Sequence, residues 1–134
     1  MEDQAHRAVV ILGPPGAGKG TQGRALGQMP DLLHISMGEV FRSLPADTPS
    51  RRELRAKIEQ GDLVPDDQVL RVLQEHLDKL TSKGVYRMGY DVLLLDGVPR
   101  NEAQGRMLSE RFRLLGVLLL QMNDRGRIIQ RLKG

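Results

Sequence analysis

The sequence predicts an α/β fold: a parallel sheet with helices on both faces and a small helical insertion. Short apolar runs alternate with segments of helical spacing, and the runs lie at residues 9–12, 33–36, 92–96 and 117–122. Strands that alternate with helices are joined by right-handed crossovers and lie parallel in one sheet. A glycine-rich turn after the first run and a turn-rich insertion after the second are the other two observations that predict this fold.

The first expected strand, VVIL at residues 9–12, is apolar throughout, as is typical of a strand buried on both faces. It leads into a turn whose glycines allow backbone N–H groups to approach an anion closely. A helix is expected from about Lys19, with its positive dipole end at the same place. The G-x-x-x-x-G-K spacing therefore predicts the phosphate loop of a P-loop NTPase, with Lys19 against the outer phosphates. The residues expected to hold the nucleotide are Gly13, Pro14, Gly16, Ala17, Gly18, Lys19, Gly20 and Thr21.

The loop departs from the general pattern in one respect, because Gly20 follows the lysine and Thr21 comes one step later. In this form GPPGAGKGTQ resembles the phosphate loop of the adenylate kinase family of nucleoside monophosphate kinases. Three further segments follow in the order of that family. They are HISMGEVFR at residues 34–42, GDLVPDDQVL at 61–70 and LLLDGVPRNEAQ at 93–104. The resemblance covers nearly the whole chain and implies ATP and Mg²⁺ as cofactors.

After the second strand, residues 44–60 interrupt the alternation of strands and helices. SLPADTPS is rich in turn residues, and RRELRAKIEQ has the pattern of a short helix. The resemblance implies that residues 37–65 form a monophosphate-binding subdomain within a single P-loop kinase core spanning 1–134. A longer helix is expected from about Asp66 to Leu80, with its apolar residues on one side.

Phosphoryl transfer depends mainly on positioning and on positive charge around the phosphate oxygens, so arginines and lysines are the residues to follow. Arg42 and Arg100 match the family arginines that hold the acceptor phosphate, and with Lys19 they are the expected catalytic residues. The alternative for both is a solvated surface arginine. The resemblance assigns monophosphate binding to Met37, Gly38, Arg42, Leu63, Val64, Gly97, Arg100 and Gln104.

The identity of the acceptor base depends on Gln104, which matches a glutamine whose amide pairs with adenine. AMP is therefore the favoured acceptor, although Gln104 also fits a helix cap with Asn101. Met37 and Val98 stand where the family has threonine and phenylalanine, so CMP, UMP and GMP stay open. Leu63 and Val64 would contact the base or serve only as packing residues.

Asp96 ends the third apolar run and matches the family aspartate that orders the water shell of Mg²⁺. One such carboxylate suffices, because Mg²⁺ usually keeps several of its waters. The alternative is that Asp96 caps the following turn.

The last segment, IIQRLKG at residues 128–134, resembles the helix that leads into the family's lid, and Arg131 matches an arginine that stacks on the donor adenine. The lid and the last strand and helix of the family do not follow. Two functions therefore stay open: transfer of the γ-phosphoryl of Mg-ATP to a monophosphate, or nucleotide binding without turnover. A P-loop hydrolase is disfavoured, because DGVPR at 96–100 resembles an acceptor-phosphate site that a hydrolase does not need.

The amino-acid composition limits the classes of partner that the chain is expected to bind. The 134-residue chain has a net charge of +3, but its arginines are scattered and it has two Tyr, two Phe and no Trp, which argues against nucleic acid. It has no apolar run long enough for a signal peptide or a membrane span, and no cysteine. We expect a cytoplasmic enzyme with small-molecule substrates that is a monomer when complete.

Overall fold

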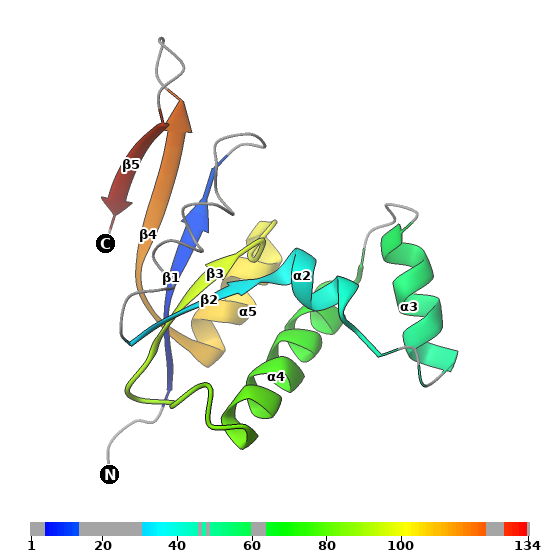
Figure 1. Cartoon of the computed structure of the whole chain (residues 1–134). Coiled ribbons are helices and arrows are strands. Elements are labelled where there is room, and N and C mark those ends of the chain that lie inside the picture. The colour runs from blue at the N-terminus through cyan, green and yellow to red at the C-terminus, as the bar shows by residue number, and fades with distance from the viewer. Residues whose placement is uncertain are drawn as a thin grey trace.

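In a computed structural model the chain forms a five-stranded sheet with strand order β2-β3-β1-β4-β5 (Figure 1). The structure describes residues 5–13, 31–45, 47, 49–59, 64–122 and 128–133. The strands are β1 (His6–Leu12), β2 (Leu32–Ser36), β3 (Val92–Asp96), β4 (Phe112–Met122) and β5 (Ile128–Lys133). The helices are α2 (Met37–Arg42), α3 (Pro49–Glu59), α4 (Asp66–Ser82) and α5 (Glu102–Arg111). The first four strands are parallel, which confirms the predicted α/β class.

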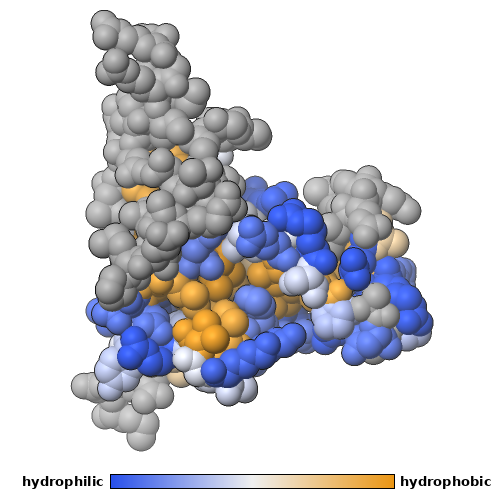
Figure 2. All heavy atoms as spheres, in the orientation of Figure 1, coloured by the Kyte–Doolittle hydropathy of each residue, from blue (hydrophilic) through white to orange (hydrophobic). Residues whose placement is uncertain are grey.

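Strand β3, which lies between β2 and β1, is buried on both faces, as its unbroken apolar sequence requires. Leu93 and Leu95 pack into the larger core cluster, which also contains the apolar face of α4. Leu94, which points to the other face, packs with Ile11 and Leu120 in a second cluster. Figure 2 shows apolar residues gathered in the middle of the face turned to the viewer, with hydrophilic residues around them.

Helix α4 covers the larger cluster with the side that its apolar spacing predicts. Val69, Val72, Leu73 and Leu77 are buried there, and Leu70 joins them. The helix extends to Ser82, slightly beyond the expected end at Leu80. Figure 1 shows α3 at the far end of the molecule from β4 and β5, with α2 between it and the sheet.

Strand β4 begins five residues before the expected run at 117–122. Phe112 caps the C-terminus of α5 and directly starts the strand, so no loop separates the two elements. The pairing with β1 shifts between Ala8 and Val9, which face Leu114 and Gly116, so Leu115 is an extra, bulged residue. The bulge lies before residue 117, outside the apolar run from which the strand was predicted.

The helix predicted over residues 128–134 is wrong, because Ile128–Lys133 form strand β5. This strand pairs antiparallel with β4, with Met122 opposite Ile128 and Val117 opposite Lys133. Two physical features favour the strand. Ile128 and Ile129 are β-branched, and pairing satisfies the edge of β4 that faces away from β1.

At the amino ends of the strands, Arg87 joins the segments that enter β2 and β3. Its guanidinium lies 2.9 Å from Asp31 Oδ1 and 3.0 Å from Asp91 Oδ1, and its backbone N–H donates to Asp91 Oδ2 at 2.7 Å. The hydrogen bonds from Arg87 lower the pKa of Asp91 from its ordinary value. The ionised form of Asp91 therefore stabilises the folded chain.

We predict that the free energy of unfolding decreases as the pH falls below about 4, because a carboxylate with a lowered pKa binds protons more readily in the unfolded chain. Stability from this pair is present above the unfolded pKa and is lost as the pH falls through the folded one. Urea unfolding between pH 3 and 7 measures the effect. Asp91→Asn should lower the midpoint at pH 7 and flatten its pH dependence. An unchanged dependence in that variant would contradict the assignment to Asp91.

Candidate functional site

The carboxyl ends of β1, β2 and β3 meet at one edge of the sheet, where ligands of parallel α/β sheets collect. Asp96, the last residue of β3, is in register with Ile11 of β1 and with Ser36 of β2. The predicted phosphate loop starts from β1 at Gly13, so its first residue lies at the same edge as Asp96. The structure thus brings together the start of the loop, the start of α2 and the DGVPR segment.

The backbone turns sharply at Gly97, directly after β3. Its φ of +92° lies in the region that favours glycine, and a Cβ placed there would lie 3.4 Å from Met37 Cβ and 3.8 Å from Arg100 Nη2. Arg100 folds back over this turn, and its Nε donates to the carbonyl oxygen of Gly97 at 3.0 Å. The peptide bond between Val98 and Pro99 is cis.

We predict that Gly97→Ala costs about 1–3 kcal/mol of stability, because an L side chain is strained at this φ. Chemical denaturation provides the measurement. Gly105→Ala is the matched control: this glycine lies within α5, and its added methyl group would meet only Pro99, at 3.9 Å. There alanine should stabilise by up to about 1 kcal/mol. Equal losses in both variants would show that backbone strain at Gly97 is not the cause.

Arg42 brings a second guanidinium to the same edge. An ideal Cβ on Gly38 would lie 3.2 Å from Arg42 Nη1, so this guanidinium packs directly over the first turn of α2. A larger residue at position 38 would push it away. Arg42 and Arg100 are both exposed, and no carboxylate in the described part of the chain pairs with either. Two cations without acidic partners among the described residues therefore flank Met37 and Gly38.

Gln104 is buried, with 4% of its surface exposed, and both ends of its amide are engaged. Its Oε1 accepts from the backbone N–H of Arg100 at 2.8 Å, and its Nε2 donates to Asp66 Oδ1 at 3.0 Å. The predicted helix cap is also present, because Asn101 Oδ1 accepts a hydrogen bond from the backbone N–H of Gln104 at 2.8 Å. A base that paired with this amide would compete with the contacts to Arg100 and Asp66.

Asp66 is a residue of this site that the sequence analysis missed. It accepts from Asn101 Nδ2 at 2.9 Å as well as from Gln104, and these two hydrogen bonds lower its pKa. Asp66 thereby joins the first turn of α4 to the first turn of α5. The pair of aspartates that opens α4 was the available signal, but it identifies a helix start and no distant partner.

Asp96 is buried and lies against a histidine. His34 Nε2 is 3.3 Å from Asp96 Oδ2, and both side chains are more than nine-tenths buried. His34 lies on β2 on the same face as Ser36, two residues away. The sequence did not predict this contact. Strands β2 and β3 are neighbours in the sheet but lie far apart in the sequence.

The remaining predicted residues divide into two groups. Met37 is 1% exposed within the core, and Val64 packs partly buried against the same cluster, which fits its alternative as a packing residue. The other group lies outside the described residues: Pro14, Gly16, Ala17, Gly18, Lys19, Gly20, Thr21 and Leu63. Arg131 belongs to β5, but its side chain is not among those described.

The described residues contain neither a cluster of metal ligands nor a membrane-spanning helix. Among the described side chains, no group of three or more His, Cys, Asp or Glu residues is placed to hold a metal ion. No helix in the described ranges is both long and apolar enough to cross a membrane.

Comparison with known proteins gives consistent results. A family model described as adenylate kinase matches residues 11–134. A protein named adenylate kinase from Chlamydia trachomatis serovar L2 is 34% identical over 91% of this chain and 54% of its own length. Adenylate kinases from Thermosipho africanus and Rickettsia conorii are 42% and 41% identical over 81% and 75% of this chain, and over 48% and 45% of their own lengths. The chain spans about half the length of these curated relatives.

Proposed function

Because the chain belongs to the adenylate kinase family, we propose that it transfers the γ-phosphoryl group of Mg-ATP to a nucleoside monophosphate, with AMP as the favoured acceptor. The products would be two molecules of ADP. Nucleotide binding without turnover is the second candidate.

The observation that carries the proposal is the pair of arginines at the carboxyl edge of the sheet. Arg42 reaches this edge from α2 and Arg100 from the turn after β3, and each lacks a carboxylate partner among the described residues. Arginine presents several N–H donors in a planar fork that suits phosphate oxygens. The two side chains would hold the acceptor phosphate and orient its attacking oxygen in line with the donor.

Lys19 would supply charge on the donor side. The loop that contains it starts from Gly13, where β1 ends beside Asp96. A lysine in such a loop reaches the outer phosphates, and its charge stabilises the negative charge that shifts during transfer. The donor and acceptor phosphates would thus meet between Lys19 and the arginine pair.

Asp96 fits a role toward Mg²⁺, since it offers carboxylate oxygens at the end of β3, next to the start of the loop. Mg²⁺ binds to few protein ligands beside substrate phosphates, so a single carboxylate is compatible with it. When bound, the ion would neutralise charge on the donor phosphates. Asp96 would accept hydrogen bonds from its waters, and His34 would hold the carboxylate in place.

Adenine selection by Gln104 is the finer part of the proposal. The hydrogen bond between the Gln104 amide and the backbone of Arg100 supports this role, because Arg100 would hold the acceptor phosphate. Exchange of its contact with Asp66 for a base would release one N–H donor of the amide and leave Asp66 with Asn101. The absence of cysteine from the chain is in keeping with a cytoplasmic location, which we propose for this activity. We also expect the protein to be a monomer.

The test is formation of ADP from ATP, Mg²⁺ and each of AMP, CMP, UMP and GMP in turn, with Lys19→Ala as the control. Turnover with AMP that is lost in the control is the expected result. Turnover with another monophosphate would correct the acceptor. If none is phosphorylated while calorimetry still detects ATP binding that depends on Lys19, the chain is a binding module.

A further inference from the structure

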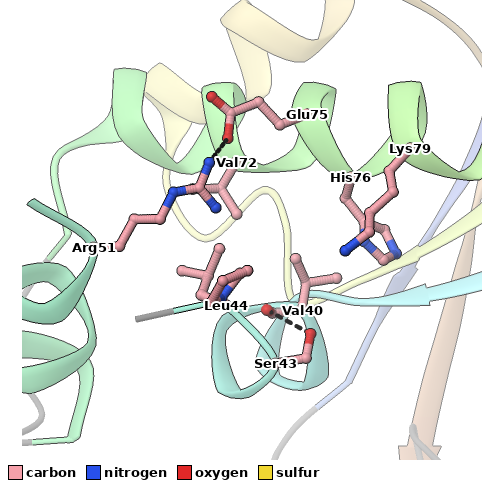
Figure 3. A pocket seen from close by; sticks show the side chains of 9 residues that line it. Val40, Ser43, Leu44, Arg51, Val72, Glu75, His76 and Lys79 are labelled. Carbon is pink, nitrogen blue, oxygen red and sulfur yellow. Dashed lines mark hydrogen bonds and ion pairs between the residues drawn. The ribbon is translucent and has the colours of Figure 1, made fainter. Parts of the chain in front are cut away.

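A pocket of about 210 Å³ lies at the C-terminal end of α2, the end opposite to Met37 and Gly38 (Figure 3). Helices α2, α3 and α4 all contribute to it. Its lining residues are Val40, Ser43, Leu44, Pro45, Arg51, Val72, Glu75, His76 and Lys79. None of these residues belongs to the candidate phosphotransfer site.

The pocket has an apolar floor and a polar wall. Val40, Leu44 and Val72 are buried core residues that form the apolar part. Figure 3 shows Arg51 and Glu75 on one side, where the guanidinium approaches Glu75 Oε2 at 3.5 Å. On the other side His76 and Lys79 extend from α4 toward α2.

The charges around the pocket leave a positive side. Glu75, the single acid of the lining, already pairs with Arg51. His76 and Lys79 lie three residues apart on one face of α4, and neither side chain has a hydrogen bond or ion pair within the described chain. Burial lowers the pKa of His76, and the nearby charges of Lys79 and Lys83 lower it further. The lining residues of α2 carry no charge.

We propose that this pocket binds a small oxyanion on a short apolar body. Lys79 and His76 would donate to the oxyanion, and the body would contact Val40, Leu44 and Val72. A ligand of a few carbon atoms with one phosphate or carboxylate group suits the volume and the division into polar and apolar walls. The proposal is independent of the phosphotransfer activity.

The chain's three histidines provide a test in one experiment. His76 lines the pocket, His34 contacts Asp96 at the carboxyl edge, and His6 lies against Tyr86 at the opposite end of the sheet. NMR spectra of ring-labelled histidines, assigned with His76→Gln, are recorded while butyl phosphate, butyrate or inorganic phosphate is added. We expect saturable shifts of the His76 signals, with butyl phosphate binding more tightly than inorganic phosphate.

Matched variants show whether the pocket itself is responsible. Lys79→Gln should weaken binding of butyl phosphate about fivefold, as for an exposed ion pair at the upper end of its usual strength. Lys83→Gln removes an equal charge at the C-cap of the same helix, outside the lining, and should change binding less than twofold. Bound anion should also raise the pKa of His76, measured by pH titration with and without ligand.

Three outcomes would overturn the proposal. His76 signals that do not move would show that no oxyanion enters the pocket. Shifts confined to His34 would place all binding at the carboxyl edge. Equal weakening in the Lys79 and Lys83 variants would indicate a diffuse attraction of anions to the helix.

Discussion

Replacement of Arg100 by alanine is expected to lower kcat/KM for ADP formation about 10²- to 10³-fold, the range seen when one preorganised donor to a transition-state oxyanion is removed. Arg100 is exposed, and its Nε is held by the carbonyl oxygen of Gly97, so the guanidinium is oriented before a substrate binds. Arg100→Lys should recover little of the loss, because an ammonium cannot form two parallel hydrogen bonds to a phosphate. Steady-state assays with varied AMP measure both effects.

The matched control for Arg100 is Arg106→Ala. Arg106 is an exposed arginine on α5, so its removal changes the net charge equally without altering the carboxyl edge. The kcat/KM of the Arg106→Ala variant should stay within about twofold of the value for the unmodified chain, since surface substitutions of this kind have small effects. If both variants lose activity equally, the charge of the whole chain matters and the arginine at position 100 has no special role.

The sequence predicted those features that depend on local rules. Strand β3 could be predicted because its apolar run is unbroken and ends at Asp96 and Gly97, residues that favour a turn. The start of α5 could be predicted because Asn101 and Gln104 have the spacing of a capping box, and Asn101 does accept from the Gln104 N–H. Both signals lie within a few residues of the structure that they determine.

The features that were missed depend on contacts between distant segments. Asp66 is 38 residues from Gln104, and His34 is 62 residues from Asp96, so neither pair leaves a trace in the local pattern. The family resemblance predicts a helix at residues 128–134, whereas the β-branched residues Ile128 and Ile129 favour the strand that forms there. Residues 128–133 form a strand because they pair with the edge of β4 that faces away from β1. The order of the strands in the sheet shows this edge, and the sequence does not.

Leu73→Ala is expected to destabilise the chain by about 2–5 kcal/mol, a large part of the 5–15 kcal/mol that typically separates folded from unfolded domains. Leu73 has no exposed surface and lies midway along α4, within the cluster that also holds Ile35, Leu93 and Leu95 of the sheet. Because strands on one side and the helix backbone on the other hold the walls apart, the cavity cannot close fully. Urea unfolding should show a lower midpoint with an unchanged slope.

Leu115→Ala removes the same atoms from an exposed position and serves as the control. Leu115 is 44% exposed and is the bulged residue of β4, so its side chain contributes little to either core cluster. Its loss should change stability by about 0.5 kcal/mol or less. If the two leucines cost the same, the packing of α4 on the sheet does not hold this fold together. A much larger loss of stability in Leu73→Ala than in Leu115→Ala would assign the stability of the fold to the interface between α4 and the sheet. The same helix carries Asp66 in its first turn.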